Sequence, residues 1–152
     1  MRRRAGYTLI ELVLVMALLG VASLVAAPAV GRAVDGIRVR TEVAGVASLL
    51  RWARAEAVTR GRTYAVTLDT DGRALLVRPR GVEPTTGSER RRQLSSLVQV
   101  APASGSVLPP ITFTPQGRSS GGALRIDAAG PRAYVVTVDV LTGRVTTRRV
   151  DS

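Results

Sequence analysis

Glu11 is the residue near the start of the chain whose type and position could do chemistry. It follows a short basic leader that ends at Gly6, and it precedes twenty residues without a charge, 12–31. Placing a lone carboxylate in the apolar core of a membrane costs roughly 2.5–3.5 kcal/mol on insertion scales. The carboxylate therefore needs a partner, and no residue within the uncharged run can supply one. We interpret Glu11 as a candidate functional residue.

The rest of the composition argues against an enzyme. The chain has neither cysteine nor histidine, so it has no thiol nucleophile, no imidazole base and no zinc-ligand cluster. Asp139 or Glu83 could act as an acid or base, but no second positioned group accompanies either one. The glycine-rich turn 117–122 lacks the lysine and the following helix of a phosphate-binding loop. We expect no catalytic residues, no metal and no cofactor.

The charge of the chain is strongly positive and is carried by arginine alone. The formal net charge is +11, and all 22 basic residues are Arg. A basic surface can attract nucleic acid or anionic lipid, yet these arginines are spread along the sequence. One tight cluster follows the leader, at 90–92, within a segment of proline and glycine (79–92) that we interpret as a solvated loop.

The uncharged run has the length of a membrane-spanning helix, since roughly 20 apolar residues cross a bilayer. Arg2, Arg3 and Arg4 favour a cytoplasmic N-terminus, which places the bulk of the chain on the other side of the membrane. Pro28 should kink or loosen the helix, because proline removes a backbone donor and clashes with the preceding turn.

Two plainer explanations of this segment remain open. An ordinary secretory signal could be cleaved after Val25-Ala26-Ala27, but Pro28 would then follow the cut and Glu11 would interrupt the apolar core. An uncleaved anchor explains the length of the run but explains neither Gly6 nor Glu11.

The remainder of the chain predicts a helix followed by an antiparallel sheet. The helix extends to Arg60, with apolar residues at helical spacing at Val43, Val46, Leu50, Ala53 and Ala57, and Gly61 is a helix stop. The period then switches to two, and Asp71-Gly72 is a strong hairpin signal. We expect an α+β fold in which the sheet, which can fold into two layers, packs on the helix. The candidate strands are 64–68, 74–77, 94–100, 111–114, 123–127, 133–139 and 144–150.

The N-terminal pattern resembles the signal of type IV pilins and type II secretion pseudopilins. The resemblance implies that a prepilin peptidase cuts between Gly6 and Tyr7 and that Tyr7 is then N-methylated; the family usually has Phe at this position. It also implies that Glu11 pairs with the N-terminal amine of a neighbouring subunit. The expected segments are a leader (1–6), a transmembrane and assembly helix (7–31), an amphipathic helix (32–61) and a periplasmic β-domain (62–152).

The C-terminal half resembles the GspH group of minor pseudopilins, a domain that FimT-like minor pilins share. The stretches that carry this resemblance are Phe113–Gly122, Tyr134–Asp139 and Leu141–Val145. It implies a non-enzymatic subunit of a periplasmic filament that drives protein export, held in the bacterial inner membrane. The implied partners are the prepilin peptidase, other major and minor pseudopilins, the inner-membrane assembly platform and the lipid bilayer.

A FimT-like minor pilin that captures DNA, or that helps pilus assembly, is the alternative function. FimT-like DNA binders tend to carry a Gly-Arg-x-Arg turn near the C-terminus. The matching stretch here is Gly143-Arg144-Val145-Thr146, which lacks the second arginine, although Arg148 and Arg149 follow. Nucleic acid is a partner only in this alternative, with Arg144, Arg148 and Arg149 as its contacts.

Overall fold

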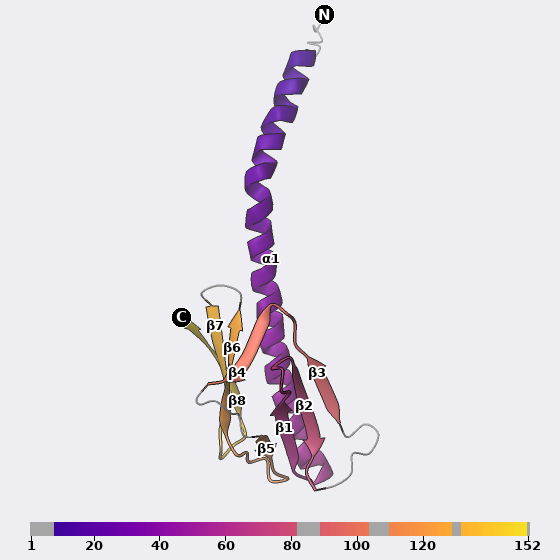
Figure 1. Cartoon of the computed structure of the whole chain (residues 1–152), viewed down its shortest axis with the longest axis vertical. Coiled ribbons are helices and arrows are strands. Elements are labelled where there is room, and N and C mark those ends of the chain that lie inside the picture. Colours follow the sequence, from indigo (N-terminus) through magenta and orange to yellow (C-terminus); the bar gives the residue numbers. More distant parts are fainter. Residues whose placement is uncertain (1–7, 82–88, 104–109, 129–131, 152) are drawn as a thin grey trace, which may run out of the picture. The chain divides into compact units, whose positions relative to one another are not determined.

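The computed structural model describes residues 8–81, 89–103, 110–128 and 132–151, and the side chains of 25–33 and 151 lie outside the description. In those ranges the chain forms one helix and eight strands (Figure 1). The chain divides into two compact units, residues 1–37 and 38–152.

Helix α1 spans Leu9–Arg60. Thr8 caps its start, because the Glu11 backbone N–H lies 3.1 Å from the Thr8 carbonyl oxygen and 3.4 Å from its hydroxyl oxygen. Gly61, with φ of 61°, ends it. The N–H of Gly61 donates to Val58 and that of Arg62 to Ala57, which is the Schellman pattern. The predicted helix stop at Gly61 is confirmed.

The part of α1 in the first unit remains helical through Pro28, where the sequence predicts a kink or loosening. The side chain of Pro28 is outside the description, so the kink stays a prediction. Large apolar side chains between Leu9 and Leu24 are exposed. In the part of the chain that the structure describes, no helix combines the length and the apolar character needed to cross a membrane.

The second unit contains two four-stranded sheets in which every neighbouring pair of strands is antiparallel. The first has the order β3-β2-β1-β5 and the second the order β4-β6-β7-β8. The first sheet consists of β1 (Tyr64–Leu68), β2 (Ala74–Pro79), β3 (Arg90–Gln93) and β5 (Ile111–Phe113). The second consists of β4 (Val98–Pro102), β6 (Gly122–Ala128), β7 (Arg132–Val138) and β8 (Val145–Asp151).

One hydrophobic core joins the C-terminal half of α1 to both sheets. The predicted helical stripe is confirmed, because all five of its members are buried: Val43, Val46, Leu50, Ala53 and Ala57. Tyr64 and Phe113 enter this core from the first sheet, and Leu124 and Ile126 enter from the second. Half-buried Trp52 closes its edge, with its ring 6.5 Å from that of Tyr64 in a T-shaped arrangement. The predicted α+β architecture, a long helix packed on antiparallel sheet, is therefore confirmed, and the strands form two four-stranded sheets.

The arginine triplet 90–92 forms β3, so its interpretation as part of a loop is wrong. The triplet pairs with β2, and the pairing sets Arg90 opposite Val77 and Arg92 opposite Leu75. Val77 and Leu75 are buried, so Arg90 and Arg92 share the face that looks toward α1. Because side chains alternate along a strand, Arg90 and Arg92 lie on one face of the sheet and Arg91 lies on the other.

Each of the three arginines has a different partner. The guanidinium of Arg90 lies 5.1 Å from the centre of the Trp52 ring, a cation–π contact. Arg92 pairs with Glu42 at 3.1 Å and lies across Gly45, where a Cβ would collide with it. Arg91 points to the opposite face and pairs with Asp69 at 3.2 Å. Inward-pointing charges also protect this edge strand from pairing with another chain.

A second arginine joins α1 to two turns in what we call the Arg54 junction (Arg54, Gly117, Ser119 and Gly143). Arg54 Nε donates to the Gly117 carbonyl oxygen at 3.1 Å. Buried Ser119 donates its hydroxyl to the Asp139 carbonyl oxygen at 3.0 Å and accepts the Gly121 N–H at 2.8 Å. The loop between β5 and β6 is therefore tied both to the helix and to the turn after β7.

Gly143 and Gly61 form a matched pair that tests this junction, since both have φ of 61°. Gly61→Ala should destabilise by about 1 kcal/mol, the strain of an L residue in left-handed backbone, because nothing lies within 4 Å of the new Cβ. Gly143→Ala should cost about 1–3 kcal/mol more, because its Cβ would press on the Gly117 carbonyl oxygen and lie 2.8 Å from Arg54 Nε. Urea titrations of both variants measure the difference, and equal losses would contradict the packing described.

Candidate functional site

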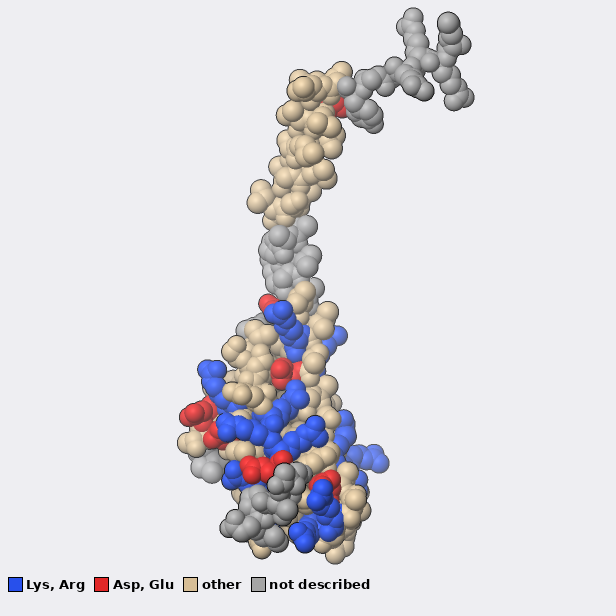
Figure 2. Space-filling view, turned by 90° about the vertical axis from the view of Figure 1, so that its right-hand side faces the viewer, with Lys and Arg blue, Asp and Glu red and all other residues tan. Residues whose placement is uncertain are grey.

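Glu11 lies in the first turn of α1, three residues after the Thr8 cap. The sequence Thr8-Leu9-Ile10-Glu11 is thus that of a capping box, in which an N-cap Ser or Thr is followed three positions later by Glu. A carboxylate in the first turn is also favoured by the helix dipole. No described residue forms an ion pair with Glu11. Figure 2 shows the described part of the first unit as almost wholly uncharged, with acidic colour near its N-terminal end.

The predicted cleavage and methylation residues, Gly6 and Tyr7, lie outside the described residues. The first described residue, Thr8, directly follows Tyr7 and caps the helix. Glu11 thus stands in the fifth position after the predicted cut, and α1 starts at the third. Pro28, the predicted helix break, lies seventeen positions after Glu11 in the sequence, inside α1.

The structure does not bring Arg144, Arg148 and Arg149 together on one surface. Arg149 pairs with Tyr134 across β7 and β8, and Arg148 pairs with Val135. Because successive side chains alternate across a strand, Arg148 and Arg149 lie on opposite faces of the second sheet. Arg149 lies on the same face of the second sheet as buried Val136, which is the face toward the core. A single patch made from the three arginines is absent from this part of the structure.

Arg144 instead lies beside two helix arginines that the sequence analysis left out. A depression of about 370 Å³ is lined by Arg51 and Arg54 from α1 and by residues 142–145 from the turn that leads into β8. All three arginines are exposed, and no described acidic side chain lines the depression. Three arginines from two elements thus line one hollow, which suits an anionic group.

Asp139 has a structural task in the turn that leads to Arg144. Its carboxylate accepts hydrogen bonds from the Thr142 hydroxyl at 2.7 Å, the Thr142 N–H at 2.8 Å and the Leu141 N–H at 3.1 Å. These bonds, with the nearby charge of Arg144, hold the pKa of Asp139 below its ordinary value of 3.8. A carboxylate so stabilised is poorly suited to proton transfer near neutral pH. Glu83, the other candidate acid or base, lies outside the described residues.

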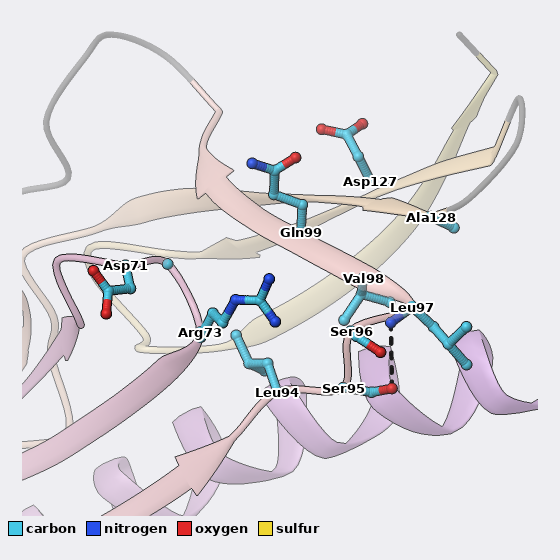
Figure 3. A pocket seen from close by; sticks show the side chains of 11 residues that line it. Asp71, Arg73, Leu94, Ser95, Ser96, Leu97, Val98, Gln99, Asp127 and Ala128 are labelled. Atoms are coloured by element: carbon cyan, nitrogen blue, oxygen red, sulfur yellow. Dashed lines mark hydrogen bonds between the residues drawn. The ribbon is translucent and has the colours of Figure 1, made fainter.

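A further hollow of about 400 Å³ lies between the β1–β2 turn, the β3–β4 connection and the ends of β4 and β6. Figure 3 shows Asp71 and Asp127 at separate ends of this hollow, with Arg73 between them. Its internal hydrogen bond runs from the Leu97 N–H to the Ser95 hydroxyl at 3.3 Å. The two carboxylates do not face each other, so the described lining has no acid–base pair for catalysis.

Sequence reasoning did not single out Arg51 and Arg54, because charged residues are common on the solvent side of an amphipathic helix. A signal was nevertheless present. The two arginines are three positions apart, so they share a helix face. The glycines at 117 and 143 stand in turns whose tight backbone leaves room for a guanidinium group. Only the folded chain reveals that these three segments meet.

Comparison with known proteins gives matches at both ends of the chain. Residues 42–143 match the family described as type II transport protein GspH. Residues 1–27 match the prokaryotic N-terminal methylation motif. A type II secretion system protein H from Xanthomonas campestris pv. campestris is 33% identical over 72 residues, which are 47% of this chain. The matched stretch spans 43% of the length of that relative.

Solved structures of pilin-like proteins have the same fold. The minor pseudopilin EpsH from the type 2 secretion system of Vibrio cholerae superposes with a TM-score of 0.55 at 17% identity, covering 75% of this chain and 97% of EpsH. The type IV minor pilin FimU of Pseudomonas aeruginosa superposes with a TM-score of 0.58 at 17% identity, covering 72% of this chain and 87% of FimU. At this identity the likeness concerns the fold alone.

The hydrogen bonds of the Asp139 turn should make the folded protein less stable at acidic pH. Because folding lowers the pKa of Asp139, its stabilising effect is complete above its ordinary pKa of 3.8 and is lost as the pH falls through the lower folded value. Asp139→Asn should therefore have a lower melting temperature than the wild type at pH 7. The difference between the two melting temperatures should decrease as the pH falls below 3.8. Melting curves measured across this range test the prediction, with Asp71→Asn as the control for loss of charge. A gap that widens on acidification would refute it.

Proposed function

The chain belongs to the GspH family of type II transport proteins, and from that premise we propose that it is a minor pseudopilin of a type II secretion system. The family consists of structural proteins rather than enzymes. In this proposal the protein assembles into a short periplasmic filament that drives protein export. Its partners are other major and minor pseudopilins and the inner-membrane assembly platform.

The position of Glu11 is the observation that carries the proposal. It is a carboxylate in the first turn of a helix whose following side chains, as far as Leu24, are exposed and, apart from Ser23, apolar. An isolated chain gains nothing from this exposed apolar surface, whereas packing against other helices would bury it. A neighbouring subunit's N-terminal amine would supply the charge partner that Glu11 lacks among the described residues.

We propose that the N-terminal segment anchors the protein before assembly. The membership of the family supports attachment to the inner membrane. In detail, residues 7–31 would cross the bilayer, with the leader on the cytoplasmic side and the β-domain in the periplasm. The prepilin peptidase would remove residues 1–6 and leave Tyr7 as the methylated N-terminus.

The type IV pilus is the alternative host filament, because the fold is equally that of the minor pilin FimU. A minor pilin that captures DNA would need Arg144, Arg148 and Arg149 to lie on one contact surface. With Arg148 and Arg149 on opposite faces of the second sheet, a phosphate backbone would meet at most part of this set at once. We therefore favour secretion.

Processing by the peptidase is the first consequence to test. Intact masses of the protein from cells with and without prepilin peptidase should differ by the leader Met1–Gly6, offset by one methyl group. Gly6→Val should leave the protein unprocessed, because a β-branched side chain crowds a site that accepts glycine. Ala5→Val, one residue away, is the matched control and should still be cut. An N-terminus at Pro28, or an unchanged mass in both strains, would sink the proposal.

Docking through Glu11 is the second consequence. Glu11→Val should insert and be cleaved normally, since it removes a costly charge from an apolar segment. Its crosslinking to other pilin-like subunits should fail, because the neighbour's amine would be buried without a partner. In vivo crosslinking of cysteine pairs between subunits is the measurement.

Because Glu11 also belongs to a capping box, a second variant must separate docking from helix capping. Thr8→Val removes the capping hydroxyl and keeps the carboxylate. It should lower the stability of the first turn by about 1 kcal/mol and leave crosslinking largely intact. If Thr8→Val and Glu11→Val lose crosslinking equally, capping explains the effect and docking by Glu11 is wrong.

A further inference from the structure

The seam between α1 and strand β8 carries two adjoining hollows in the second unit. One, of about 370 Å³, is the arginine hollow lined by Arg51, Arg54 and Arg144. The other, of about 280 Å³, is an apolar groove lined by Val43, Ala44 and Ala47 of the helix and by Tyr134 and Thr147 of the sheet. Arg51 lines both, so the two hollows adjoin along one side of α1.

The arginine hollow is held in shape by the backbone around it. Arg54 is fixed by its bond to the Gly117 carbonyl oxygen, and Gly143 in the floor is buried. The Arg144 N–H donates to the Thr142 hydroxyl at 3.3 Å, which sets the course of the chain into β8. Three like charges brought together in this way repel one another, and the Asp139 carboxylate near Arg144 offsets only part of this repulsion. A carboxylate held by the guanidinium forks of Arg51 and Arg144 would relieve the rest.

The apolar groove has the complementary character. Val43 and Ala47 are buried in its floor, whereas Ala44 is exposed and half-buried Tyr134 forms one wall. The small side chains at 44 and 47 leave room for an incoming apolar side chain. Arg40 and Arg51 also line the groove, Arg40 at the end away from the arginine hollow. The groove can therefore take one apolar side chain between two arginines.

We propose that this seam binds an extended peptide segment of a partner protein, with an acidic side chain in the arginine hollow and an apolar side chain in the groove. A nucleic acid strand would match the arginines but would place a phosphate or sugar against Val43, Ala44 and Ala47. Arg51, Arg54 and Arg144 also gather at one end of the seam, and Arg40 borders its other end, so these arginines do not form the continuous track that a phosphate backbone follows. An acidic and apolar peptide satisfies both halves of the seam.

The helix fixes the spacing that such a peptide needs. The middle of Arg51–Arg54 lies about seven residues from the middle of Val43–Ala47, which is about 11 Å at 1.5 Å per residue. An extended peptide covers this span in about three to four residues at 3.3 Å each. Because side chains alternate, only positions an even number apart point to the same side. The acidic and apolar residues should therefore be four positions apart.

The test uses the full chain in detergent micelles and fluorescein-labelled nine-residue peptides of serine and threonine with one Asp and one Leu. The Asp and Leu stand three, four or five positions apart, in both orders. We expect saturable binding, by fluorescence anisotropy, that is tightest at a spacing of four. Replacing Asp by Asn, or using Arg51→Gln with Arg144→Gln, should weaken it by about tenfold or more. Arg54 is left unchanged because it holds the junction.

Arg148→Gln is the matched control for each single variant, Arg51→Gln or Arg144→Gln, since it removes one arginine from the opposite face of the second sheet and should change binding less than about twofold. Binding that is absent up to about 1 mM, that ignores the spacing, or that falls equally in the control overturns the proposal. A short duplex DNA that displaces the peptide and binds more tightly would also overturn it, in favour of nucleic acid. The site goes beyond the proposed function: this assay involves neither the leader nor Glu11, so its failure leaves docking through Glu11 untouched.

Discussion

Burial of one face of α1 against both sheets is the interaction on which the second unit depends. Each sheet has one apolar face, and an apolar face must be covered by another layer. The same helical stripe covers both, since residues from the helix, the first sheet and the second sheet belong to one core. The helix is therefore the shared support that fixes where the turns after β5 and β7 meet. Small residues on that stripe, Ala53 and Ala57, let the sheets approach closely.

Arginine has structural tasks here that its charge alone does not suggest. Arg90 covers the Trp52 ring, Arg92 lies on Gly45, and Arg54 bonds a backbone carbonyl in a distant loop. A planar guanidinium can stack and donate in its plane at once, which the ammonium of lysine cannot do. A glycine under the guanidinium recurs at 45, 117 and 143, because any Cβ there would meet the arginine. The net charge is thus partly a by-product of packing.

Much of the fold followed from local rules that the sequence displays. Helical spacing located the buried stripe, Gly61 ended the helix, and alternation placed most of the strands. Strand β3 was missed because its three consecutive arginines show no apolar alternation. What alternates along the strand is a helix-facing and a solvent-facing arginine. The trio Arg144, Arg148 and Arg149 was grouped by nearness in sequence, whereas neighbours on a strand point to opposite faces. The hollow of Arg51, Arg54 and Arg144 depends on long-range packing, so no local pattern could predict it.

The chemistry at the start of α1 has an electrostatic requirement of its own. Backbone N–H groups make the beginning of a helix positive, which disfavours the approach of an amine. A carboxylate in the first turn reverses the sign of that local charge and also strengthens the cap begun by Thr8. In the docking that we propose, Glu11 would therefore have to act as an excess negative charge over the helix dipole and not merely balance it. That requirement explains why a neutral hydrogen-bonding side chain at this position would cap the helix yet be a poor partner for an amine.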